Sequence, residues 1–235
     1  MLLSIIIPTL NEEKYLPRLL ADLRKQSFTD YEIIVSDGGS KDRTAEIAKV
    51  AGCHFIVDDR VKHPSHQRNN GAKIAQGELL MFFDADTELT REFLEKSISE
   101  FKRRKLTAAG YYIKFNPNQI LYKFFAFFFN LFLWSRQYLG AAAVGAGLMA
   151  ERRAHDLING FDERLYVAED YDYCYRLAKV GRFRLIKSCK LLYSSRRLEQ
   201  DGKFKTLFRW LMMGIFTSLN LKIKKKIVRY DFGKF

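Results

Sequence analysis

Short apolar segments alternate with segments of helical spacing through the first hundred residues of the chain. Strands are predicted at four apolar runs, which are LLSIII, YEIIVS, CHFIV and ELLMFF, and helices near residues 14–26, 41–51 and 67–76. A further helix at about residues 91–104 is followed by a strand at TAAGYYIKF and a turn at NPN, residues 116–118. This alternation predicts an α/β fold in which a mostly parallel sheet is flanked by helices on both faces.

The second half of the chain contains apolar segments of a different kind. ILYKFFAFFFNLFLW, residues 120–134, is aromatic around most of a helix, yet it is shorter than the roughly 20 apolar residues of a membrane span. FKTLFRWLMMGIFTSLNL, residues 204–221, places apolar side chains at helical spacing and leads into KIKKKIVR. We expect one domain over residues 1–200, followed by an amphipathic helix and a basic tail at residues 201–235.

The net charge of +13 is concentrated in the same half of the chain. Residues 1–119 carry 18 basic and 17 acidic side chains, whereas residues 120–235 carry 22 and 10. A basic excess in one half indicates an anionic partner, such as phospholipid, nucleic acid or a phosphorylated substrate. Together with the apolar helices it favours peripheral attachment to an anionic membrane surface, and no nucleic acid partner is expected. The alternative is that both helices pack into the core and the lysines form a solvated end.

The cysteines and the N-terminal segment indicate a location. Cys53, Cys174 and Cys189 are far apart and form no C-x-x-C pair, which argues against a disulfide scaffold or a zinc site and fits a reducing compartment. The opening apolar run is short, has no basic leader and contains Pro8, so it indicates a first strand and not a signal peptide. We therefore expect a cytoplasmic protein at the inner face of the cell membrane.

Polar clusters follow three of the predicted strands, at residues 8–12, 37–40 and 84–86. Ligands of open α/β sheets bind at the carboxyl ends of the strands, so the three clusters are expected to converge on one crevice. The four histidines show no metal-ligand spacing, and His63 and His66 are expected in a loop over this crevice.

Asp84 and Asp86 are two residues apart at the end of a predicted strand, where alternate side chains share a face. Two neighbouring anions repel each other unless a cation lies between them. Mg²⁺ and Mn²⁺ bind one or two carboxylates together with substrate phosphates, so this pair indicates a divalent metal site. The alternative is that Asp84 ends the strand and that Asp86 or Thr87 caps a helix starting near Arg91.

A second acidic pair, Glu169 and Asp170, comes just before another predicted helix. The helix dipole favours carboxylates at this position, and this effect alone is enough to explain the presence of Glu169. An aspartate at a helix start on the rim of a cleft is also well placed to act as a base toward a substrate hydroxyl. Asp172, one turn later, is expected to be a surface or capping residue.

Taken in order, these segments resemble the family 2 glycosyltransferases of the GT-A fold, and the resemblance covers most of the chain. SIIIPTLNEEKYLPRLL and EIIVSDGGSKDRT resemble the two nucleotide-binding loops of that family, and QRNNGAKIAQGELLMFFDAD resembles its Arg-Asn segment and D-x-D motif. GAGLMAERRAHDLINGFDERLYVAEDYDYCYRLAKVGRF resembles its small-residue strand, Gly-Phe turn and acceptor-side Glu-Asp motif. The resemblance implies a Rossmann-like catalytic domain with a nucleotide-binding half at residues 1–115 and an acceptor half at residues 116–200.

The resemblance also implies roles for single residues. A nucleotide-diphosphate sugar would be the donor, with Mn²⁺ or Mg²⁺ on its diphosphate. Asp86 would be the metal ligand proper, Asp84 would hold ribose or metal, and Asp170 would be the base of an inverting transfer of one sugar to a hydroxyl acceptor, lipid-linked or membrane-associated. The residues expected to contact the donor are Pro8, Thr9, Glu12, Asp37, Arg68, Asp84, Ala85, Arg196 and Arg197.

The chain departs from the family pattern at two places. Gly38 stands where a second aspartate is usual, which removes one possible base or ribose contact. TLFRW, residues 206–210, has the Arg-Trp but not the Gln of the Q-x-x-R-W motif of processive synthases, which favours single-sugar transfer.

Three alternatives stay open at this point. Polyprenyl-phosphate sugar synthases resemble the first half of the chain, but their ionised phosphate acceptor needs no strong base. Sugar-nucleotide nucleotidylyltransferases generally carry a Gly-rich basic loop where this chain has PTLNEEKYLP. A basic membrane- or RNA-binding module without catalysis would leave Asp37, Asp84, Asp86 and Asp170 without a role.

Overall fold

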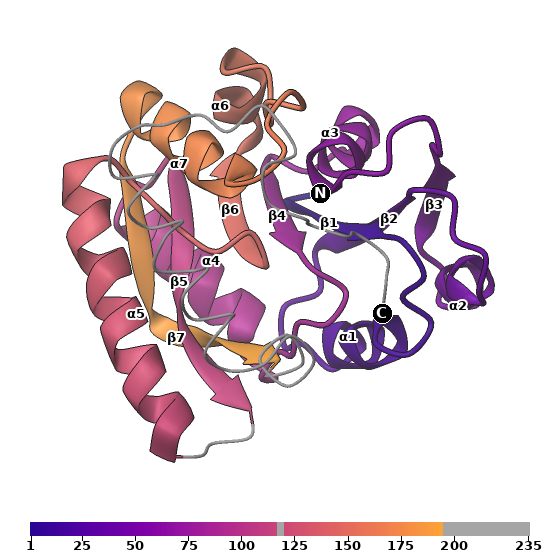
Figure 1. The fold of residues 1–235 in the computed structure, drawn as a ribbon, viewed down its shortest axis with the longest axis horizontal. Coiled ribbons are helices and arrows are strands. Elements are labelled where there is room, and N and C mark those ends of the chain that lie inside the picture. The colour runs from indigo at the N-terminus through magenta and orange to yellow at the C-terminus, as the bar shows by residue number, and fades with distance from the viewer. Residues whose placement is uncertain (117–119, 195–235) are drawn as a thin grey trace.

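In a computed structural model, which describes residues 1–116 and 120–194, the chain forms a seven-stranded sheet with helices on both faces (Figure 1). The order of the strands across the sheet is β3-β2-β1-β4-β6-β5-β7. The strands are β1 Leu3–Thr9, β2 Tyr31–Asp37, β3 His54–Val57, β4 Leu79–Phe83, β5 Ala108–Asn116, β6 Gly147–Glu151 and β7 Phe183–Ser194. All five strands predicted from the apolar runs are therefore present.

Most neighbouring strands run parallel, as predicted. β1 pairs in parallel with β2 and β4, β2 with β3, and β5 with β7. Only β6 runs against its two neighbours, β4 and β5, within this sheet. Because β1, β2 and β4 are parallel, the polar segments that follow them lie at the same edge of the sheet.

The helices cover the two faces of the sheet with separate hydrophobic clusters. Their bounds are α1 Leu16–Arg24, α2 Thr44–Val50, α3 Pro64–Ile74, α4 Phe93–Arg103, α5 Ile120–Leu139, α6 Arg152–Leu157 and α7 Glu169–Val180. Helices α1, α2 and α4 pack in one cluster, and α3, α5, α6 and α7 pack in the other. In β1, Ile5 and Ile7 belong to the first cluster and Ile6 to the second, which explains why this strand is apolar throughout.

Helix α3 begins earlier than the sequence indicates. It starts at Pro64, and His63 is its N-cap, with a ring nitrogen that accepts a hydrogen bond from the Ser65 N–H. Proline is well tolerated in the first turn of a helix because its missing N–H would have no partner there. The predicted loop position holds for His63, which precedes the helix, but it is wrong for His66, which is a buried residue of the helix.

The aromatic segment after β5 forms helix α5, which runs five residues beyond the predicted range. Among the described helices, none combines the length and the apolar character that crossing a bilayer requires. The second predicted apolar helix, at residues 204–221, and the basic tail lie outside the described residues, as do Pro117 and Asn118 of the predicted turn.

Asn130 binds the backbone of β5 at a position beyond the residues of β5 that pair with β6. Its side-chain amide donates to the carbonyl of Ile113 at 2.9 Å and accepts from the Ile113 N–H at 2.8 Å, so it takes the place of a neighbouring strand. Ile113 itself is buried against Tyr122 and Ala126 of the helix. This contact explains the amide at position 130 within the apolar segment 120–134.

Replacing Asn130 with leucine is expected to lower the free energy of unfolding by about 1–3 kcal/mol, because two partly buried backbone groups lose their partner. Urea unfolding measures the change, and Phe128→Leu, at an exposed position of the same helix, is the control. An unchanged midpoint for Asn130→Leu would show that this amide does not stabilise the fold.

Candidate active site

The first two polar clusters are joined by hydrogen bonds at the carboxyl ends of β1 and β2. Thr9 Oγ1 donates to Asp37 at 2.8 Å, and the Asn11 N–H donates to Ser40 Oγ at 2.8 Å. Pro8 lies beside Ser36 in the β1–β2 pairing, and Glu12 is buried, with its N–H bonded to Thr44 Oγ1. The expected convergence of these two clusters is confirmed.

Asp37 is 2% exposed, and its carboxylate is the centre of the loop after β2. It accepts hydrogen bonds from Thr9 Oγ1, the Gly39 N–H, the Ser40 N–H and Ser40 Oγ. A carboxylate has about four acceptor positions, so a nucleotide base that contacts Asp37 would replace one of these bonds. Helix α2 begins only at Thr44, so neither Asp37 nor Ser40 caps it.

The third cluster lies in a turn and not in a strand. β4 ends at Phe83, and the Thr87 N–H bonds to the Asp84 carbonyl at 3.0 Å, which closes a turn over Asp84, Ala85 and Asp86. The argument from alternation along a strand therefore does not apply to the two aspartates. Both are partly exposed, whereas Ala85 between them is buried. The alternative that Asp86 or Thr87 caps the next helix is wrong, since α4 begins at Phe93 with Glu92 as its N-cap.

Arg68 joins this turn to the second acidic pair. Arg68 is a residue of α3 and is 2% exposed, and its guanidinium contacts Asp84 at 2.8 Å and Glu169 at 3.2 Å. The same side chain lies over the ring of Phe161, with its guanidinium carbon 5.4 Å from the ring centroid. A buried cation between two carboxylates balances charges that would otherwise repel each other.

Asp170 lies in the first turn of α7, next to this ion-pair cluster. Its Oδ2 accepts the N–H of Gly145 at 2.9 Å, and its Oδ1 accepts the N–H of Tyr171 at 2.9 Å. Burial and the negative charge of Glu169 raise the pKa of Asp170 to about 7, against the lowering effects of Arg68 and of the two N–H groups. The residue as a whole is partly exposed, and a carboxyl group with this pKa is suited to proton transfer.

Asp172 takes part in a different contact. Its side chain is 7% exposed and pairs with Arg176 one turn later at 2.6 Å. Arg176 also donates to the carbonyls of Ile158 and Gly160. The expected surface role is therefore wrong, because Asp172 belongs to a contact that holds α7 to the turn before it.

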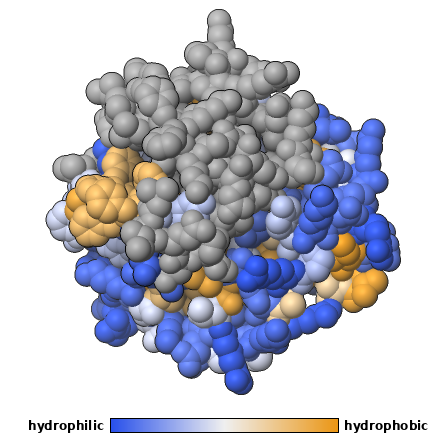
Figure 2. All heavy atoms as spheres, turned by 60° about the horizontal axis from the view of Figure 1, so that its bottom comes forward, coloured by the Kyte–Doolittle hydropathy of each residue, from blue (hydrophilic) through white to orange (hydrophobic). Residues whose placement is uncertain are grey.

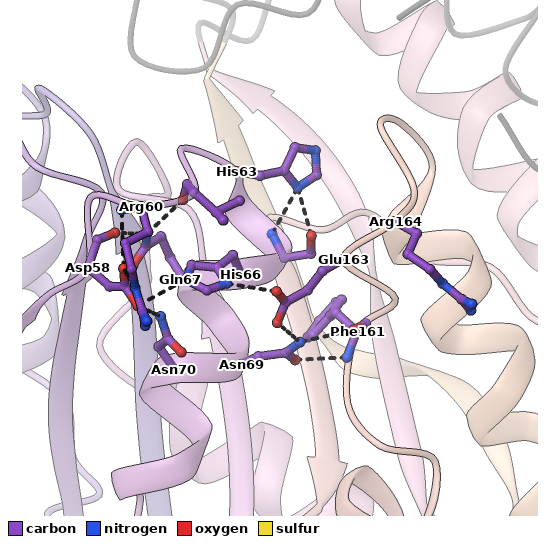
Figure 3. A network of polar contacts seen from close by, with 12 residues as sticks. Asp58, Arg60, His63, His66, Gln67, Asn69, Asn70, Phe161, Glu163 and Arg164 are labelled. Carbon is purple, nitrogen blue, oxygen red and sulfur yellow. Dashed lines mark hydrogen bonds and ion pairs between the residues drawn. The ribbon is translucent and has the colours of Figure 1, made fainter. Parts of the chain in front are cut away.

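A second polar network holds the loop that precedes α7, and sequence reasoning missed it (Figure 3). Asn69 binds both backbone groups of Phe161, and its amide also donates to Glu163 at 2.7 Å. His66 bridges Glu163 at 2.7 Å and Asp58 at 3.1 Å. These contacts span up to 97 positions of sequence, so no local pattern announces them. They tie α3, which carries Arg68, to the loop that leads to Asp170.

The donor atoms at the β4 turn suit a hard divalent cation. Asp84 and Asp86 present carboxylate oxygens, and Mg²⁺ or Mn²⁺ needs only one or two of these when substrate phosphates complete the shell. Within the described part of the chain, no group of three or more histidine, cysteine, aspartate or glutamate side chains is arranged to hold a metal. Oxygens of a bound substrate or of water would complete the shell of a cation at this turn.

The Glu169→Gln variant is expected to lower the pKa of Asp170. The substitution removes a neighbouring negative charge that raises this pKa, and it leaves the charge of Arg68 less balanced, which acts in the same direction. A carbon-13 NMR titration of the Asp170 carboxyl measures the change, and Glu163→Gln, whose carboxylate contacts His66 and Asn69, is the control. A pKa of Asp170 that is equal in the Glu169→Gln and parent proteins would contradict this electrostatic account.

Residues 4–154 match the family model described as glycosyl transferase family 2, and this match covers more than half of the chain. The chain belongs to glycosyl transferase family 2. This is the family that the motifs indicated.

Known relatives of this glycosyltransferase include enzymes of different lengths. UDP-Glc:alpha-D-GlcNAc-diphosphoundecaprenol beta-1,3-glucosyltransferase WfgD of Escherichia coli is 27% identical over 227 residues, which are 92% of this chain and 86% of that protein. Chondroitin synthase of Escherichia coli is 28% identical over 201 residues, which are 82% of this chain. This chain spans only 28% to 36% of the length of chondroitin synthase and two further glycosyltransferase relatives.

Solved structures confirm the predicted GT-A fold. The structure of S. aureus TarS 1-349 in complex with UDP-GlcNAc aligns with a TM-score of 0.69 at 20% identity and covers 92% of this chain and 67% of that one. Mannosyltransferase PcManGT from Pyrobaculum calidifontis, in complex with GDP-Man and Mn²⁺, aligns with a TM-score of 0.69 at 18% identity and covers 81% of this chain and 56% of that one. At these identities the likeness shows the fold alone.

Proposed function

We propose that this family 2 glycosyltransferase transfers one sugar from a nucleotide-diphosphate sugar to a hydroxyl group of a lipid-linked or membrane-associated acceptor, with inversion at the anomeric carbon. The observation that carries the proposal is the contact of Arg68 with both Asp84 and Glu169, beside Asp170. It brings the expected donor-side and acceptor-side motifs, which are about a hundred positions apart, to one place. The name of WfgD, with its UDP-Glc donor and diphosphoundecaprenol-linked acceptor, supports the same chemistry.

The donor would lie along the carboxyl ends of β1, β2 and β4. Pro8, Thr9 and Glu12 would line the pocket of the base, and Asp37 would contact the base by exchanging one of its four hydrogen bonds. Arg68 and Ala85 would lie near the sugar diphosphate. Arg196 and Arg197, which we propose to close over the diphosphate, lie outside the described residues.

In the proposed reaction, Asp170 takes the proton of the acceptor hydroxyl. The oxygen attacks the anomeric carbon from the face opposite the nucleotide, the bond from that carbon to the diphosphate breaks, and the nucleoside diphosphate leaves with the bonding electrons. A divalent cation, Mn²⁺ or Mg²⁺, held by Asp86 and Asp84 with the donor phosphates, would supply charge stabilisation for the leaving group. Arg68 balances the charges of Asp84 and Glu169, so that the acidic groups remain in place around the reacting atoms.

We also propose that residues 1–200 form the catalytic domain and that the enzyme works at the inner face of the cell membrane. The named lipid-linked acceptors of two relatives support this location, since undecaprenol-linked substrates are held by a bilayer.

The proposal is tested by incubating the protein and Mn²⁺ with UDP- and GDP-linked sugars and either a polyprenol-diphosphate-linked saccharide or a polyprenyl phosphate. When the saccharide acceptor is present, we expect the protein to release either UDP or GDP from its sugar donor. NMR of the product is expected to show that the configuration at the anomeric carbon is inverted. Transfer to the polyprenyl phosphate alone would overturn the proposed hydroxyl acceptor, and retention of configuration would overturn the proposed role of Asp170.

A further inference from the structure

Helix α5 exposes a continuous stripe of large apolar side chains. Phe124, Phe127, Phe128, Leu131, Trp134 and Tyr138 are between 47% and 63% exposed, and their spacing of three and four residues places them on one side of the helix. Figure 2 shows hydrophobic side chains gathered at the left edge of the molecule, over the position of α5 in Figure 1. We name these six residues the α5 stripe.

The opposite side of α5 is held firmly, so the stripe faces outward in a defined direction. Tyr122 and Leu133 are buried in the hydrophobic clusters below the helix. Asn130 binds the backbone of Ile113, and Gln137 accepts the N–H of Leu185 at 3.2 Å. Two amides and the buried side chains therefore anchor the helix to β5 and β7 along its length.

A basic groove of about 530 Å³ adjoins the α5 stripe. Lys114, Lys123, Lys187 and Lys190 line it, all four are exposed, and none of the described residues in its wall is acidic. None of the ion pairs found between described residues involves these lysines. Phe127 belongs both to the groove and to the stripe, so the cationic and apolar surfaces are continuous.

The rings of the stripe contact one another in two groups. Phe128 packs edge to face against Phe124 at 4.8 Å and against Phe127 at 5.4 Å between ring centroids, and Trp134 packs against Tyr138 at 5.8 Å. Rings in mutual contact are poorly disposed to stack separate bases of a nucleic acid. Tryptophan and tyrosine are the residues that favour the boundary between lipid and water.

We propose that the α5 stripe and the four-lysine groove together form a docking site for an anionic phospholipid bilayer. The stripe enters the boundary between headgroups and acyl chains, and the lysines bind lipid phosphates. A symmetric contact between two copies is disfavoured, because it would bring the two lysine groups together without acidic partners. This inference rests on the proposed membrane attachment and assigns it to a surface, whereas donor binding is independent of it.

Vesicle co-sedimentation tests the proposal, using phosphatidylcholine alone and phosphatidylcholine mixed with phosphatidylglycerol. Phe124→Ser/Phe128→Ser removes part of the stripe, and Lys114→Glu/Lys190→Glu reverses two charges of the groove. The matched controls are Val50→Ser/Leu157→Ser, at exposed apolar residues of α2 and α6, and Lys25→Glu/Lys102→Glu, which changes the net charge equally. Thermal unfolding with and without nucleotide shows in the same samples whether each variant is folded and binds its donor.

We expect the parent to bind the anionic vesicles, and salt to weaken this binding. The lysine variant is expected to bind at least about tenfold more weakly, and the phenylalanine variant similarly, while both controls bind like the parent. The proposal would be overturned if test and control variants lost vesicle binding equally, or if the parent bound vesicles with and without phosphatidylglycerol equally well. It would also be overturned if inorganic phosphate at constant ionic strength displaced the protein from the vesicles, or if the parent formed a dimer that the phenylalanine substitutions abolished. Lost vesicle binding with retained nucleotide binding would separate this surface from the donor site.

Discussion

The Asp170→Asn variant is expected to transfer sugar to a hydroxyl acceptor about 10²- to 10⁴-fold more slowly than the parent, with donor binding unchanged. The amide is nearly isosteric with the carboxylate, and its one oxygen still accepts one of the two N–H groups that Asp170 binds, that of Gly145. It cannot accept a proton, which is the role proposed for Asp170. Initial rates measured with saturating donor give the loss, and the thermal shift produced by nucleotide reports donor binding separately.

The pH dependence of the parent gives an independent test of the same residue. Because burial and Glu169 raise the pKa of Asp170, the carboxyl is protonated and inactive as a base at pH values below about 7. The rate constant kcat/KM is therefore expected to rise with pH through the neutral range and to level off above it, with a tenfold fall per unit on the acid side. A profile that is flat from weakly acidic to weakly basic pH would contradict this assignment.

The choice of acceptor separates the proposed function from its nearest alternative. A polyprenyl phosphate is already ionised, so its attack on the anomeric carbon needs no base, and Asp170→Asn would then slow transfer only slightly. Asp156→Asn, at an exposed position of α6, is the control for a loss of negative charge. If the two variants transfer sugar equally fast to a hydroxyl acceptor, Asp170 is not the base.

The strand pattern and the positions of the first donor-side clusters were predictable because they depend on local sequence and on one rule of sheet geometry. Apolar runs such as ELLMFF form strands whatever follows them, and parallel strands bring their carboxyl ends to one edge. Thr9 and Asp37 accordingly meet, although 28 positions separate them. The resemblance to a known family then supplied the expected partners at that edge.

The contacts that complete the site were not predictable, because they join residues whose separation in sequence carries no periodicity. The ion pair of Arg68 with Glu169 spans 101 positions, and the hydrogen bond of His66 to Glu163 spans 97. The turn at Asp84 depends on the residue at which β4 stops pairing with its neighbouring strands. The apolar run in the sequence does not indicate which residue this is. Asn130 is a different case, because a polar residue within an apolar helical segment can be recognised in the sequence. Its position indicates a buried polar contact, which in the structure is the backbone of Ile113 on the adjacent strand.

The Asp86→Asn variant is expected to lose the part of donor binding that depends on metal. The described residues offer no self-sufficient cluster of metal ligands, so Mn²⁺ alone should not change the unfolding temperature of the parent. With the correct nucleotide also present at about a hundred times its Kd, stabilisation by roughly 2.7 kcal/mol is expected, and this raises Tm by about 5–10 °C in a chain of this size. In the variant, the extra shift produced by Mn²⁺ should disappear, because a neutral amide is a much weaker ligand for a hard cation.

Differential scanning fluorimetry with UDP and GDP, each with and without Mn²⁺, measures these shifts and identifies the donor base in the same experiment. Asp156→Asn provides the control for a lost carboxylate away from the β4 turn. If the shift produced by Mn²⁺ is retained in Asp86→Asn, the cation must be held by other oxygens. Asp84 is then the first candidate ligand, because it lies in the same turn and already contacts Arg68. A shift by Mn²⁺ without nucleotide would contradict the view that donor phosphates complete the metal site, and the carboxylates of the turn would then hold the cation before the donor arrives.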